Sequence, residues 1–291
     1  MGAAAPVALG VPEGVDLHDL ERIACIAAEV AGDLVVSERP ATLGVSAKST
    51  RTDVVTEMDQ ASQELLIRFM GERRPHDGVV GEEEGATVGS SGITWVLDPI
   101  DGTTNYLYGI PAYAVSVAAV VGDPSVPGGW RSIAGAVLNP VGGELFHAHV
   151  GGGARLTTDA GTVALSTTDA SDLGLALVGT GFGYDAEVRE RQARALLELL
   201  PRVRDIRRAG SAALDLCSVA CGRLDAYYET GLNAWDRAAG ELIAREAGAV
   251  VCGLAGPDAG KGLTIAVGPG LAGDFVEIVR DLTRRHVTGI H

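Results

Sequence analysis

The amino-acid sequence predicts an α/β fold, and three observations support this prediction. Segments with apolar residues at helical spacing alternate along the chain with short apolar runs that are typical of strands. The chain has 291 residues, of which 46% are hydrophobic, so it can bury the core of one large unit or of two packed lobes. Glycine and proline turns separate many of the runs. The pattern indicates α/β and leaves the number of layers open.

Two helices are expected near the start of the chain. Helical spacing over Asp16–Glu38 predicts a helix that ends before Pro40. A polar loop, Ser46 to Asp53, follows. The segment Thr56–Asp59 resembles a capping box that opens a second helix running to Pro75. The side chains expected in the core are Leu20, Ile23, Ala24, Ala27, Val30, Ala31 and Leu34 in the first helix, and Leu65, Leu66, Phe69 and Met70 in the second.

Strand-like runs dominate the middle of the chain. An apolar run from Ile93 to Leu97 predicts a buried strand that stops abruptly at Asp98. Further strands are expected at 113–121, 133–138, 144–149 and 175–179. His147 and His149 alternate on one strand face and, far from any motif, are interpreted as structural.

Helices and strands interleave in the last third of the chain. Ser211 is expected to cap the helix that follows it. The predicted helices are 186–200, 211–221, 235–247 and 271–285, and the predicted strands are 203–206, 224–228, 249–252 and 263–267.

A two-lobe organisation is expected. The linker-like stretch from Gly151 to Thr168 is the best candidate boundary. Residues 16–152 would form an N-terminal α+β lobe that carries most of the candidate metal ligands. Residues 153–291 would form a C-terminal α/β lobe that carries Asp236 and the substrate contacts, and residues 1–15 would be a flexible tail.

Composition excludes several classes of partner. The formal net charge of −15 disfavours nucleic acid and anionic membranes, because their phosphates would be repelled. No apolar stretch is long enough for a membrane span, and the amino terminus lacks the basic residues of a secretory signal. The four cysteines are expected to be buried free thiols. We therefore expect a cytoplasmic protein.

The most informative motif is the turn Asp98-Pro-Ile-Asp101-Gly102. Pro99 restricts its own φ and that of Asp98, while Gly102 permits a sharp turn, so Asp98 and Asp101 should be held close together. No Lys or Arg lies between Ser91 and Gly129, so a divalent ion such as Mg²⁺ is the expected counter-charge.

Two other acidic segments could complete such a site. Glu82 lies in an acidic triplet between Gly81 and Gly85, and Asp236 opens a predicted helix. Taken alone, the triplet would be a solvated loop and Asp236 a helix cap. Hydrolysis of a phosphate monoester needs cations at the phosphate oxygens and a positioned water, and these acids with Asp98 and Asp101 could hold the cations.

These motifs resemble those of the inositol monophosphatase family of Mg²⁺-dependent, lithium-sensitive phosphatases. The residues that match are Gly81-Glu82-Glu83, Asp98 to Asn105 and Trp235 to Gly240, in the same order and spacing. The resemblance runs from the first helix to the last strand. It implies a layered αβαβα sandwich of the inositol monophosphatase and fructose-1,6-bisphosphatase type, often assembled as a homodimer.

The resemblance also implies a division of labour among the acids. Glu82 and Asp98, with the Ile100 carbonyl, look like ligands of a first Mg²⁺, while Asp98, Asp101 and Asp236 look like ligands of a second, so that two or three ions share the site. Water activated by Mg²⁺ would attack, oriented by Glu82 and the Thr103 hydroxyl. Thr103 as a covalent nucleophile is the competing hypothesis, disfavoured because no histidine or lysine base is adjacent.

Substrate contacts follow from the same resemblance. Backbone N–H groups of Gly102 and Thr103 could hold phosphate oxygens. Glu229 would bind substrate hydroxyls, unless it is a surface strand end. Lys48 and Asp53 resemble a mobile loop that closes on the metals, and their simpler interpretation is a solvated loop. The full set of expected substrate-binding residues is Gly102, Thr103, Thr104, Gly210, Ser211, Ala212, Glu229 and Asp236.

Three functional hypotheses follow. The leading one is Mg²⁺-dependent hydrolysis of a small polyol phosphate, most directly myo-inositol 1-phosphate, with lithium as an inhibitor. Glu229 favours it, because a carboxylate suits hydroxyl groups and would repel a second phosphate. The second is hydrolysis of fructose 1,6-bisphosphate, histidinol phosphate or 3′-phosphoadenosine 5′-phosphate. The third belongs to another class, a regulatory protein-binding role.

Overall fold

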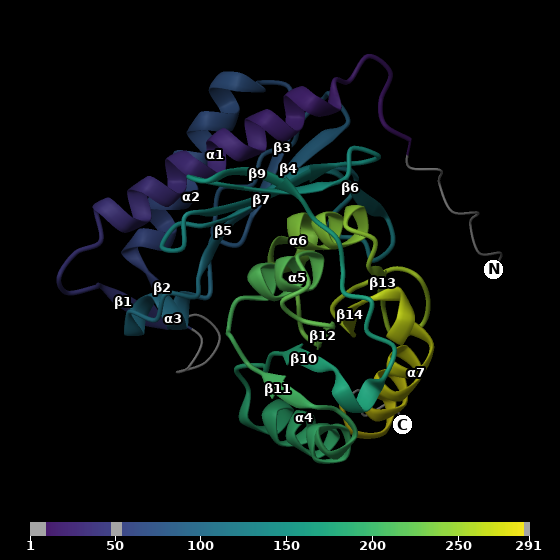
Figure 1. Ribbon diagram of the computed structural model, residues 1–291. Helices are drawn as coiled ribbons and strands as arrows, with labels where there is room; N and C mark the ends of the chain where they lie inside the picture. The colour runs from purple at the N-terminus through teal and green to yellow at the C-terminus, as the bar shows by residue number, and fades with distance from the viewer. Residues whose placement is uncertain (1–9, 48–53, 288–291) are drawn as a thin grey trace, which may run out of the picture.

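The computed structural model describes residues 10–47 and 54–287. It has five layers, in the order helix, sheet, helix, sheet, helix (Figure 1). The outer layer beside the first sheet consists of α1 (Leu17–Ser37) and α2 (Glu57–Arg73), and the central layer consists of α5 (Ala212–Ala220) and α6 (Ala234–Glu246). The fifth layer consists of α4 (Ala186–Leu199) and α7 (Ala272–Leu282). The chain is therefore an αβαβα sandwich, which confirms the predicted fold class.

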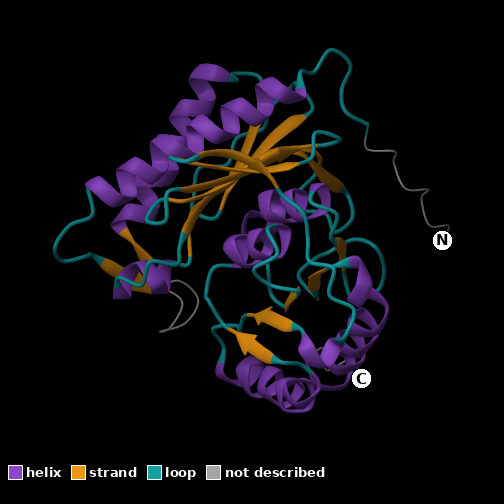
Figure 2. Cartoon of the chain, viewed as in Figure 1, coloured by secondary structure: helices purple, strands orange, loops and turns teal. Residues whose placement is uncertain are grey.

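Two sheets lie between these helical layers and are coloured orange in Figure 2. The first has seven strands in the order β3-β4-β5-β6-β7-β8-β9, and the second has five in the order β11-β10-β12-β14-β13. The bounds in the first sheet are β3 Gly78–Gly81, β4 Ile93–Asp101, β5 Ala114–Gly122, β6 Trp130–Asn139, β7 Glu144–His149, β8 Ala154–Thr158 and β9 Gly161–Ala164. The bounds in the second are β10 Leu177–Thr180, β11 Asp205–Arg207, β12 Ala226–Glu229, β13 Val250–Cys252 and β14 Thr264–Val267.

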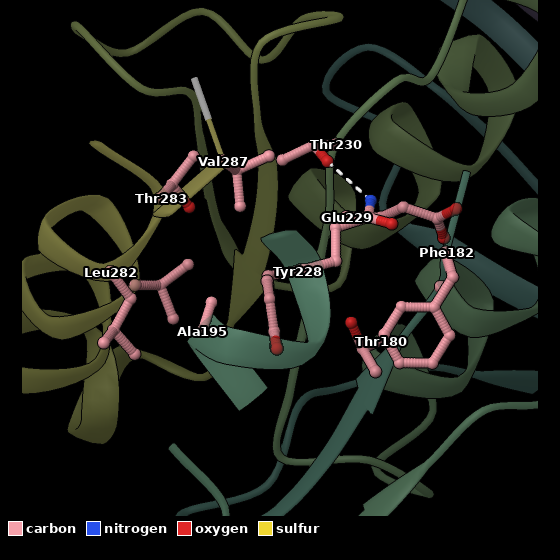
Figure 3. Close-up of a pocket in the computed structure, with 12 residues that line it drawn as sticks. Thr180, Phe182, Ala195, Tyr228, Glu229, Thr230, Leu282, Thr283 and Val287 are labelled. Atoms are coloured by element: carbon pink, nitrogen blue, oxygen red, sulfur yellow. Dashed lines mark hydrogen bonds between the residues drawn. The ribbon is translucent and has the colours of Figure 1, made fainter. Parts of the chain in front are cut away.

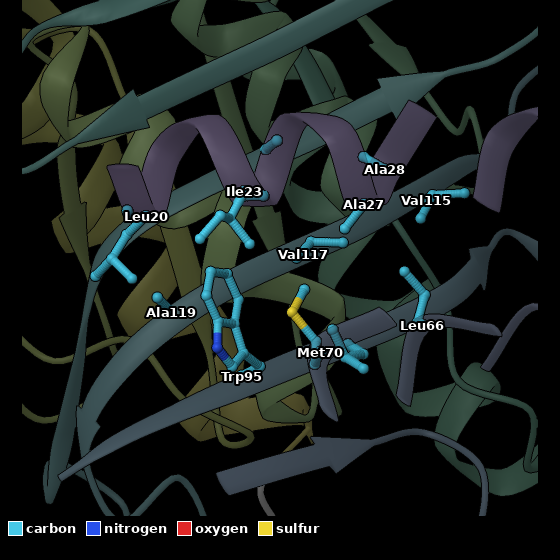
Figure 4. Packing of buried hydrophobic residues seen from close by; sticks show 14 of the residues in the cluster. Leu20, Ile23, Ala27, Ala28, Leu66, Met70, Trp95, Val115, Val117 and Ala119 are labelled. Atoms are coloured by element: carbon cyan, nitrogen blue, oxygen red, sulfur yellow. The ribbon is translucent and has the colours of Figure 1, made fainter. Parts of the chain in front are cut away.

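The core under α1 and α2 is built largely from small and branched side chains. Trp95 is its largest member and is fully buried between the helices and the sheet (Figure 4). Small alanines on α1 let the helix approach the sheet closely, so the valines of β5 pack directly beneath it. The predicted core of α1 is correct except near its end, where Val30 is 38% exposed and Val35 is buried.

The capping box predicted at the second helix is confirmed. The Asp59 carboxylate accepts hydrogen bonds from the backbone N–H of Thr56 at 2.8 Å and from its hydroxyl at 2.6 Å. Leu66 and Met70 are buried, Phe69 packs against the same cluster, and Leu65 is half-buried. The capping carboxylate is fully buried, which is unusual for a helix start and matters for the site described below.

The strand predicted to stop at Asp98 continues to Asp101. Its pairing with β5 is irregular between Asp98, which faces Ser116, and Asp101, which faces Ala114. Three residues of β4 thus span two residues of β5, which is a β-bulge. Pro99 lies inside the bulge, where its missing N–H costs no ladder hydrogen bond.

The segment 151–168, predicted to be a linker, instead contains β8 and β9. Both strands extend the first sheet beyond β7, because Phe146 pairs with Leu156, and Leu156 in turn with Val163. The first sheet therefore ends at Ala164, after the proposed boundary at 152. A division into two lobes remains a proposal.

Several other expectations are refined by the structure. The predicted polar loop 46–53 is partly paired, since β1 (Val45–Ala47) forms an antiparallel ladder with β2 (Val54–Thr56). In the proposed tail, residues 1–9 lie outside the described residues, whereas Val11 and Val15 pack against the first core. The helix expected over 271–285 ends at Leu282 and continues as a wider helical turn over Thr283–Val287. A short helix, α3 (Thr103–Tyr108), follows β4.

Short helical turns complete the described elements, at Leu173–Leu175, Leu200–Arg202 and Pro269–Leu271. All four cysteines are free thiols; Cys217 and Cys252 are buried, and Cys25 and Cys221 are half-buried. Within the described residues, no helix is both long enough and apolar enough to cross a membrane.

Candidate active site

Parallel pairing of β3 with β4 brings the first two acidic motifs together. Gly81 pairs with Leu97, and the N–H of Glu82 donates to the Leu97 carbonyl at 3.2 Å. Because parallel strands end at the same edge of a sheet, Glu82 and Asp98 emerge side by side. Residues separated by sixteen positions in the sequence are thus neighbours because of the strand direction.

The turn at the end of β4 is held by its own carboxylates. Asp98 Oδ1 accepts from the backbone N–H of Ile100 at 3.1 Å. Asp101 Oδ2 accepts from the Ser211 hydroxyl at 2.5 Å and from the Ala213 N–H at 2.7 Å. These last two bonds connect the end of β4 to the start of α5, so Asp101 is positioned by the central helical layer.

Asp236 reaches the same place from α6. It is the third residue of that helix, and its Oδ2 accepts from the N–H of Asn233 at 2.6 Å, which closes a capping box. Since α6 packs across β4, β5 and β6, its first turn lies over the end of β4. The structure therefore confirms Asp236 as a capping residue and also places it beside the end of β4, while its role as a site residue stays a prediction.

Asp98, Asp101 and Asp236 form a cluster of carboxylates whose ligand atoms lie within 4.8 Å of one another. Asp98 is 1% exposed, and its Oδ2 is buried without a hydrogen-bond partner among the described residues. An ionised oxygen in this position is costly unless a cation lies beside it. Oxygen ligands of this kind suit a hard divalent ion such as Mg²⁺, so the donor set fits the expected metal.

The pKa values in this cluster reflect the crowding of negative charge. Burial, followed by repulsion from Glu82 and Asp101, raises the pKa of Asp98 well above its usual range. Burial raises the pKa of Asp101 to about 6, although the hydrogen bond from Ser211 lowers it. Burial and then repulsion from Asp101 raise the pKa of Asp236 as well. A bound cation would reverse this repulsion and keep all three carboxylates ionised.

Asp59 contacts the expected site residue Thr103, and the sequence reasoning did not predict this contact. The Thr103 hydroxyl lies 3.1 Å from Asp59 Oδ1 and 3.2 Å from the Ile100 carbonyl, and it can donate to either. The other carboxylate oxygen of Asp59 is used by the capping box. Thr103 therefore has an adjacent carboxylate, and no hydrogen bond to a histidine or lysine is found for it within residues 10–47 and 54–287. The sequence signal for Asp59 was the capping box Thr56–Asp59, which by itself indicates only the start of a helix.

Side chains of α2 also hold the acidic motifs in place through hydrogen bonds. The amide of Gln63 donates to the Glu84 carbonyl at 2.7 Å and accepts from the Glu83 N–H at 2.9 Å. Ser62 donates to the Pro99 carbonyl at 3.3 Å. Gln63 and Ser62 are both buried, so this helix fixes the loop after β3 and the bulge of β4 as one unit.

The acids line a cavity of about 300 Å³ between the end of the first sheet and the end of β12. Glu229 forms part of the opposite wall, where the Tyr227 hydroxyl donates to its Oε2 at 2.6 Å. Burial raises the pKa of Glu229 to about 7, partly offset by this hydrogen bond. A Cβ added at Gly181 would lie 2.0 Å from Glu229 Oε2, so only glycine fits there.

Most of the expected substrate-binding residues line this cavity. They are Gly102, Thr103, Gly210, Ala212, Glu229 and Asp236. Gly102 has a φ of 98° and lies close to the Gly210 carbonyl, which a Cβ would approach to 3.0 Å. The Asn105 side-chain amide links the segment after α3 to the segment before α5, because it donates to the Ala112 carbonyl at 2.6 Å and to the Ala209 carbonyl at 2.8 Å.

Two expected residues do not line the cavity, and two others lie outside the part of the chain that the structure describes. Thr104 and Ser211 are not among the described residues that line the cavity, and the Ser211 hydroxyl is directed at Asp101. Lys48 and Asp53 lie outside the described residues. Arg208, which the sequence reasoning missed, lines the cavity and supplies a positive charge near Asp101 and Glu229. The only sequence feature that could have pointed to Arg208 is its closeness to Gly210, an expected substrate-binding residue two positions later.

A second, much smaller pocket adjoins the cavity behind Glu229. It is lined by Thr180, Phe182 and Tyr228 on one side and by Leu282 and Val287 on the other (Figure 3). Its volume of about 10 Å³ has room for about one water molecule. Glu229 and Phe182 belong to both pockets, so they form the wall that closes the main cavity at this end.

This five-layered fold with its acid-lined cavity is that of a phosphatase that acts on phosphate monoesters. Residues 16–286 match the inositol monophosphatase family, and the chain belongs to that family. It is accordingly an enzyme of the inositol-1-monophosphatase-like class of phosphoric monoester hydrolases.

Three comparisons illustrate the relationship. The chain is 48% identical over 239 residues to inositol-1-monophosphatase SuhB of Mycobacterium tuberculosis, covering 80% of each protein. It is 39% identical over 244 residues to a Pasteurella multocida protein named Nus factor SuhB, covering 82% of this chain and 87% of that one. The solved structure of Mycobacterium tuberculosis SuhB superposes with a TM-score of 0.75 at 40% identity, covering 92% of this chain and 98% of that chain.

Proposed function

We propose that this chain hydrolyses a small phosphate monoester, with myo-inositol 1-phosphate as the leading substrate and Mg²⁺ as the cofactor. The observation that carries the proposal is Asp98 Oδ2, which is buried without a partner among the described residues while Asp101 and Asp236 approach it. A protein that keeps three carboxylates so close gains from binding divalent cations.

The acids divide into two ligand sets that share Asp98. Glu82, Asp98 and the Ile100 carbonyl would hold a first Mg²⁺, and Asp98, Asp101 and Asp236 a second, with two or three ions in total. When bound, the ions would neutralise charge on the phosphate oxygens and make a nearby water a better nucleophile. All of these residues line the cavity that would receive the phosphate.

Thr103 and Asp59 supply a route for the proton of that water. When the Thr103 hydroxyl donates to Asp59 Oδ1, its oxygen is free to accept a proton from water in the cavity. As the water proton moves to the Thr103 oxygen, the original hydroxyl proton of Thr103 could pass to Asp59, which is buried and held in place by Thr56. Glu82, which follows β3 next to the end of β4, would orient the same water.

The phosphate and the polyol would contact opposite walls of the cavity. The first N–H groups of α3, at Gly102 and Thr103, have no partner within the helix and can donate to phosphate oxygens. Tyr227 fixes Glu229 Oε2, which leaves Oε1 to accept hydrogen bonds from substrate hydroxyls. Arg208 is the observation that favours the alternative substrates, because a cation in the cavity would attract a second anionic group.

The substrate proposal can be tested by comparing four compounds with Mg²⁺ and after chelation of the metal. These are inositol 1-phosphate, fructose 1,6-bisphosphate, histidinol phosphate and 3′-phosphoadenosine 5′-phosphate. We expect the highest kcat/KM for inositol 1-phosphate, no turnover without the metal, and inhibition by lithium. A competitor that is turned over far faster would replace the leading substrate, and full activity after chelation would remove the metal.

The competing hypothesis is that Thr103 attacks the phosphate as a covalent nucleophile. The structure favours this hypothesis more than the sequence does, because the Asp59 carboxylate lies beside the Thr103 hydroxyl. Rapid acid quenching during turnover, followed by mass spectrometry of the peptide containing Thr103, separates the two mechanisms. Direct attack by water predicts no phosphate adduct. An adduct that forms and decays at the turnover rate would establish the covalent route.

A regulatory protein-binding role is the second candidate class, and the relative named Nus factor SuhB motivates it. Replacing the native chain in its source organism with the Asp98→Asn variant separates the classes. A phenotype equal to that of a deletion supports catalysis as the function. Normal growth would mean that the chain serves its role without hydrolysis.

We also propose that the protein is a cytoplasmic homodimer. Light scattering on the purified chain should give twice the mass of 29.9 kDa, and cell fractionation should recover the protein with cytoplasmic markers. A monomer in solution, or recovery in another fraction, would contradict these two expectations.

A further inference from the structure

A second cluster of ionisable side chains lies outside the active site, between α1 and the first sheet. Glu21 of α1 faces His147 and His149 of β7. The His147 Nδ1 is 2.6 Å from Glu21 Oε1, and the His149 Nδ1 is 2.5 Å from Glu21 Oε2. Glu21 is 6% exposed and His149 is 5% exposed, so the cluster is part of the protein interior.

The two oxygens of Glu21 have different surroundings. On the Oε1 side, Arg155 lies 3.4 Å away, and His147 is fixed by a 3.0 Å contact of its Nε2 with the Thr157 hydroxyl. On the Oε2 side lie His149 and, one helical turn before Glu21, His18. The side with Arg155 repels cations, and the side with His18 does not.

His18 is exposed and free to act as a ligand. Its ring meets the His149 ring edge to face, with the centroids 4.3 Å apart. No hydrogen-bond partner of the His18 imidazole is found within residues 10–47 and 54–287. The ligand atoms of His18, Glu21 and His149 lie within 4.8 Å of one another.

We propose that His18, Glu21 and His149 bind a zinc-like divalent transition metal at a site separate from the active site. Two imidazoles and one carboxylate suit Zn²⁺, whereas Mg²⁺ prefers oxygen ligands alone. Ligand atoms on a four-coordinate Zn²⁺ are about 3.3 Å apart, so Glu21 Oε2 and His149 Nδ1, now 2.5 Å apart, would need to separate by about 0.8 Å as the metal replaces their shared proton. His147 would support the carboxylate from behind, as outer partners do in other metal sites.

The metal would cross-link α1 and β7, because His18 and Glu21 belong to the helix and His149 to the strand. Along α1, Glu21 is about 21 Å from Val35, whose carbonyl accepts a hydrogen bond from Tyr106 beside the catalytic turn. The site is therefore remote from the reaction, and it binds its metal in competition with the proton shared by His149 and Glu21. We expect it to affect stability and not turnover.

The test is a Zn²⁺ titration of the full chain by calorimetry at saturating Mg²⁺, with melting temperatures measured in parallel. His18→Ala removes one ligand at the surface and leaves the buried bonds of Glu21 intact. We expect it to weaken this Zn²⁺ site at least tenfold and to abolish the rise in melting temperature caused by Zn²⁺.

Two variants control the titration. His76→Ala removes an exposed histidine elsewhere and should bind Zn²⁺ as the unaltered chain does. Asp98→Asn weakens the active-site metals and should retain the second site. The proposal is overturned if His18→Ala binds Zn²⁺ with unchanged stoichiometry and affinity, or if Asp98→Asn removes all Zn²⁺ binding.

Discussion

The molecule buries carboxylates in two places and compensates their charge in two ways. The neighbours of Asp98 are other acids, and burial together with repulsion from them raises the pKa of Asp98. Around Glu21 the neighbours are imidazoles. Burial alone would raise the pKa of Glu21, but the hydrogen bonds from His147 and His149 lower it to about 2.

This contrast explains which cluster needs a metal. Within the described residues, Asp98 Oδ2 has no hydrogen-bond partner and the charge of Arg208 lies near Asp101, so the three clustered carboxylates are compensated fully only with an added cation. The Glu21 cluster is already hydrogen-bonded on both oxygens, so a metal there is optional and must displace a proton. An incompletely compensated cluster indicates a site of chemistry, and a compensated one indicates a structural role first.

The largest expected effect comes from Asp98→Asn. Losing the shared ligand should lower kcat at least about a thousandfold, because bound metal contributes several kcal/mol of transition-state stabilisation. The metal-free variant should melt at or above the temperature of the unaltered chain, since one repelling charge is gone. Steady-state kinetics and thermal unfolding measure both, with Asp159→Asn on an exposed turn as control. Unchanged turnover would remove the two-metal scheme.

Asp59→Asn should have the next largest effect. Loss of the proton acceptor beside Thr103 should lower kcat roughly 10²- to 10⁴-fold with little change in KM. Thr56→Val is the matched control, because it removes the cap but leaves the Thr103 partner in place. It should cost about 1 kcal/mol of stability and much less activity. Equal losses of kcat in both variants would mean that Asp59 acts only as a cap.

Glu21→Gln tests the compensated cluster. In buffer containing a chelator, we expect a loss of about 3 kcal/mol in the free energy of unfolding, because a buried charge network is broken. Because the folded pKa of Glu21 is lowered to about 2, its contribution is present above pH 4.5 and is lost as the pH falls towards 2. Denaturant unfolding at pH 7 and pH 3 measures this, with exposed Glu29→Gln as control. An equal loss at both pH values would contradict the network.

Glu229 lies between these two extremes, because it is half-buried and accepts one hydrogen bond, from the Tyr227 hydroxyl. Its raised pKa of about 7 means that the carboxylate form increases as the pH rises through neutrality. We expect kcat/KM for inositol 1-phosphate to rise over the same range, and Glu229→Gln to flatten that rise and increase KM on the order of tenfold. A pH profile of both enzymes measures it. An identical profile in the variant would exclude Glu229 from substrate binding.

Local sequence signals predicted the helices well and the strands less well. The first helix, the capping box at Thr56 and the cap at Ser211 were correct to within a residue or two, because spacing and caps act locally. The strands β8 and β9 were missed, since their glycine-rich, partly polar sequence is typical of a loop until β7 pairs with it. The bulge at Pro99 was missed for the same reason, because pairing with β5 decides it.

The acids that converge were named from sequence motifs, and their roles as ligands remain proposals. Residue type and spacing determined that Asp98 and Asp101 share one turn, since Pro99 and Gly102 restrict the backbone there. Only the tertiary structure decided that Glu82, Asp236 and Glu229 face that turn, because parallel pairing of β3 with β4 and the packing of α6 act over long distances. It alone decided the contacts of Asp59 with Thr103 and of Glu21 with the histidines, since a buried carboxylate is defined by neighbours that the sequence does not place.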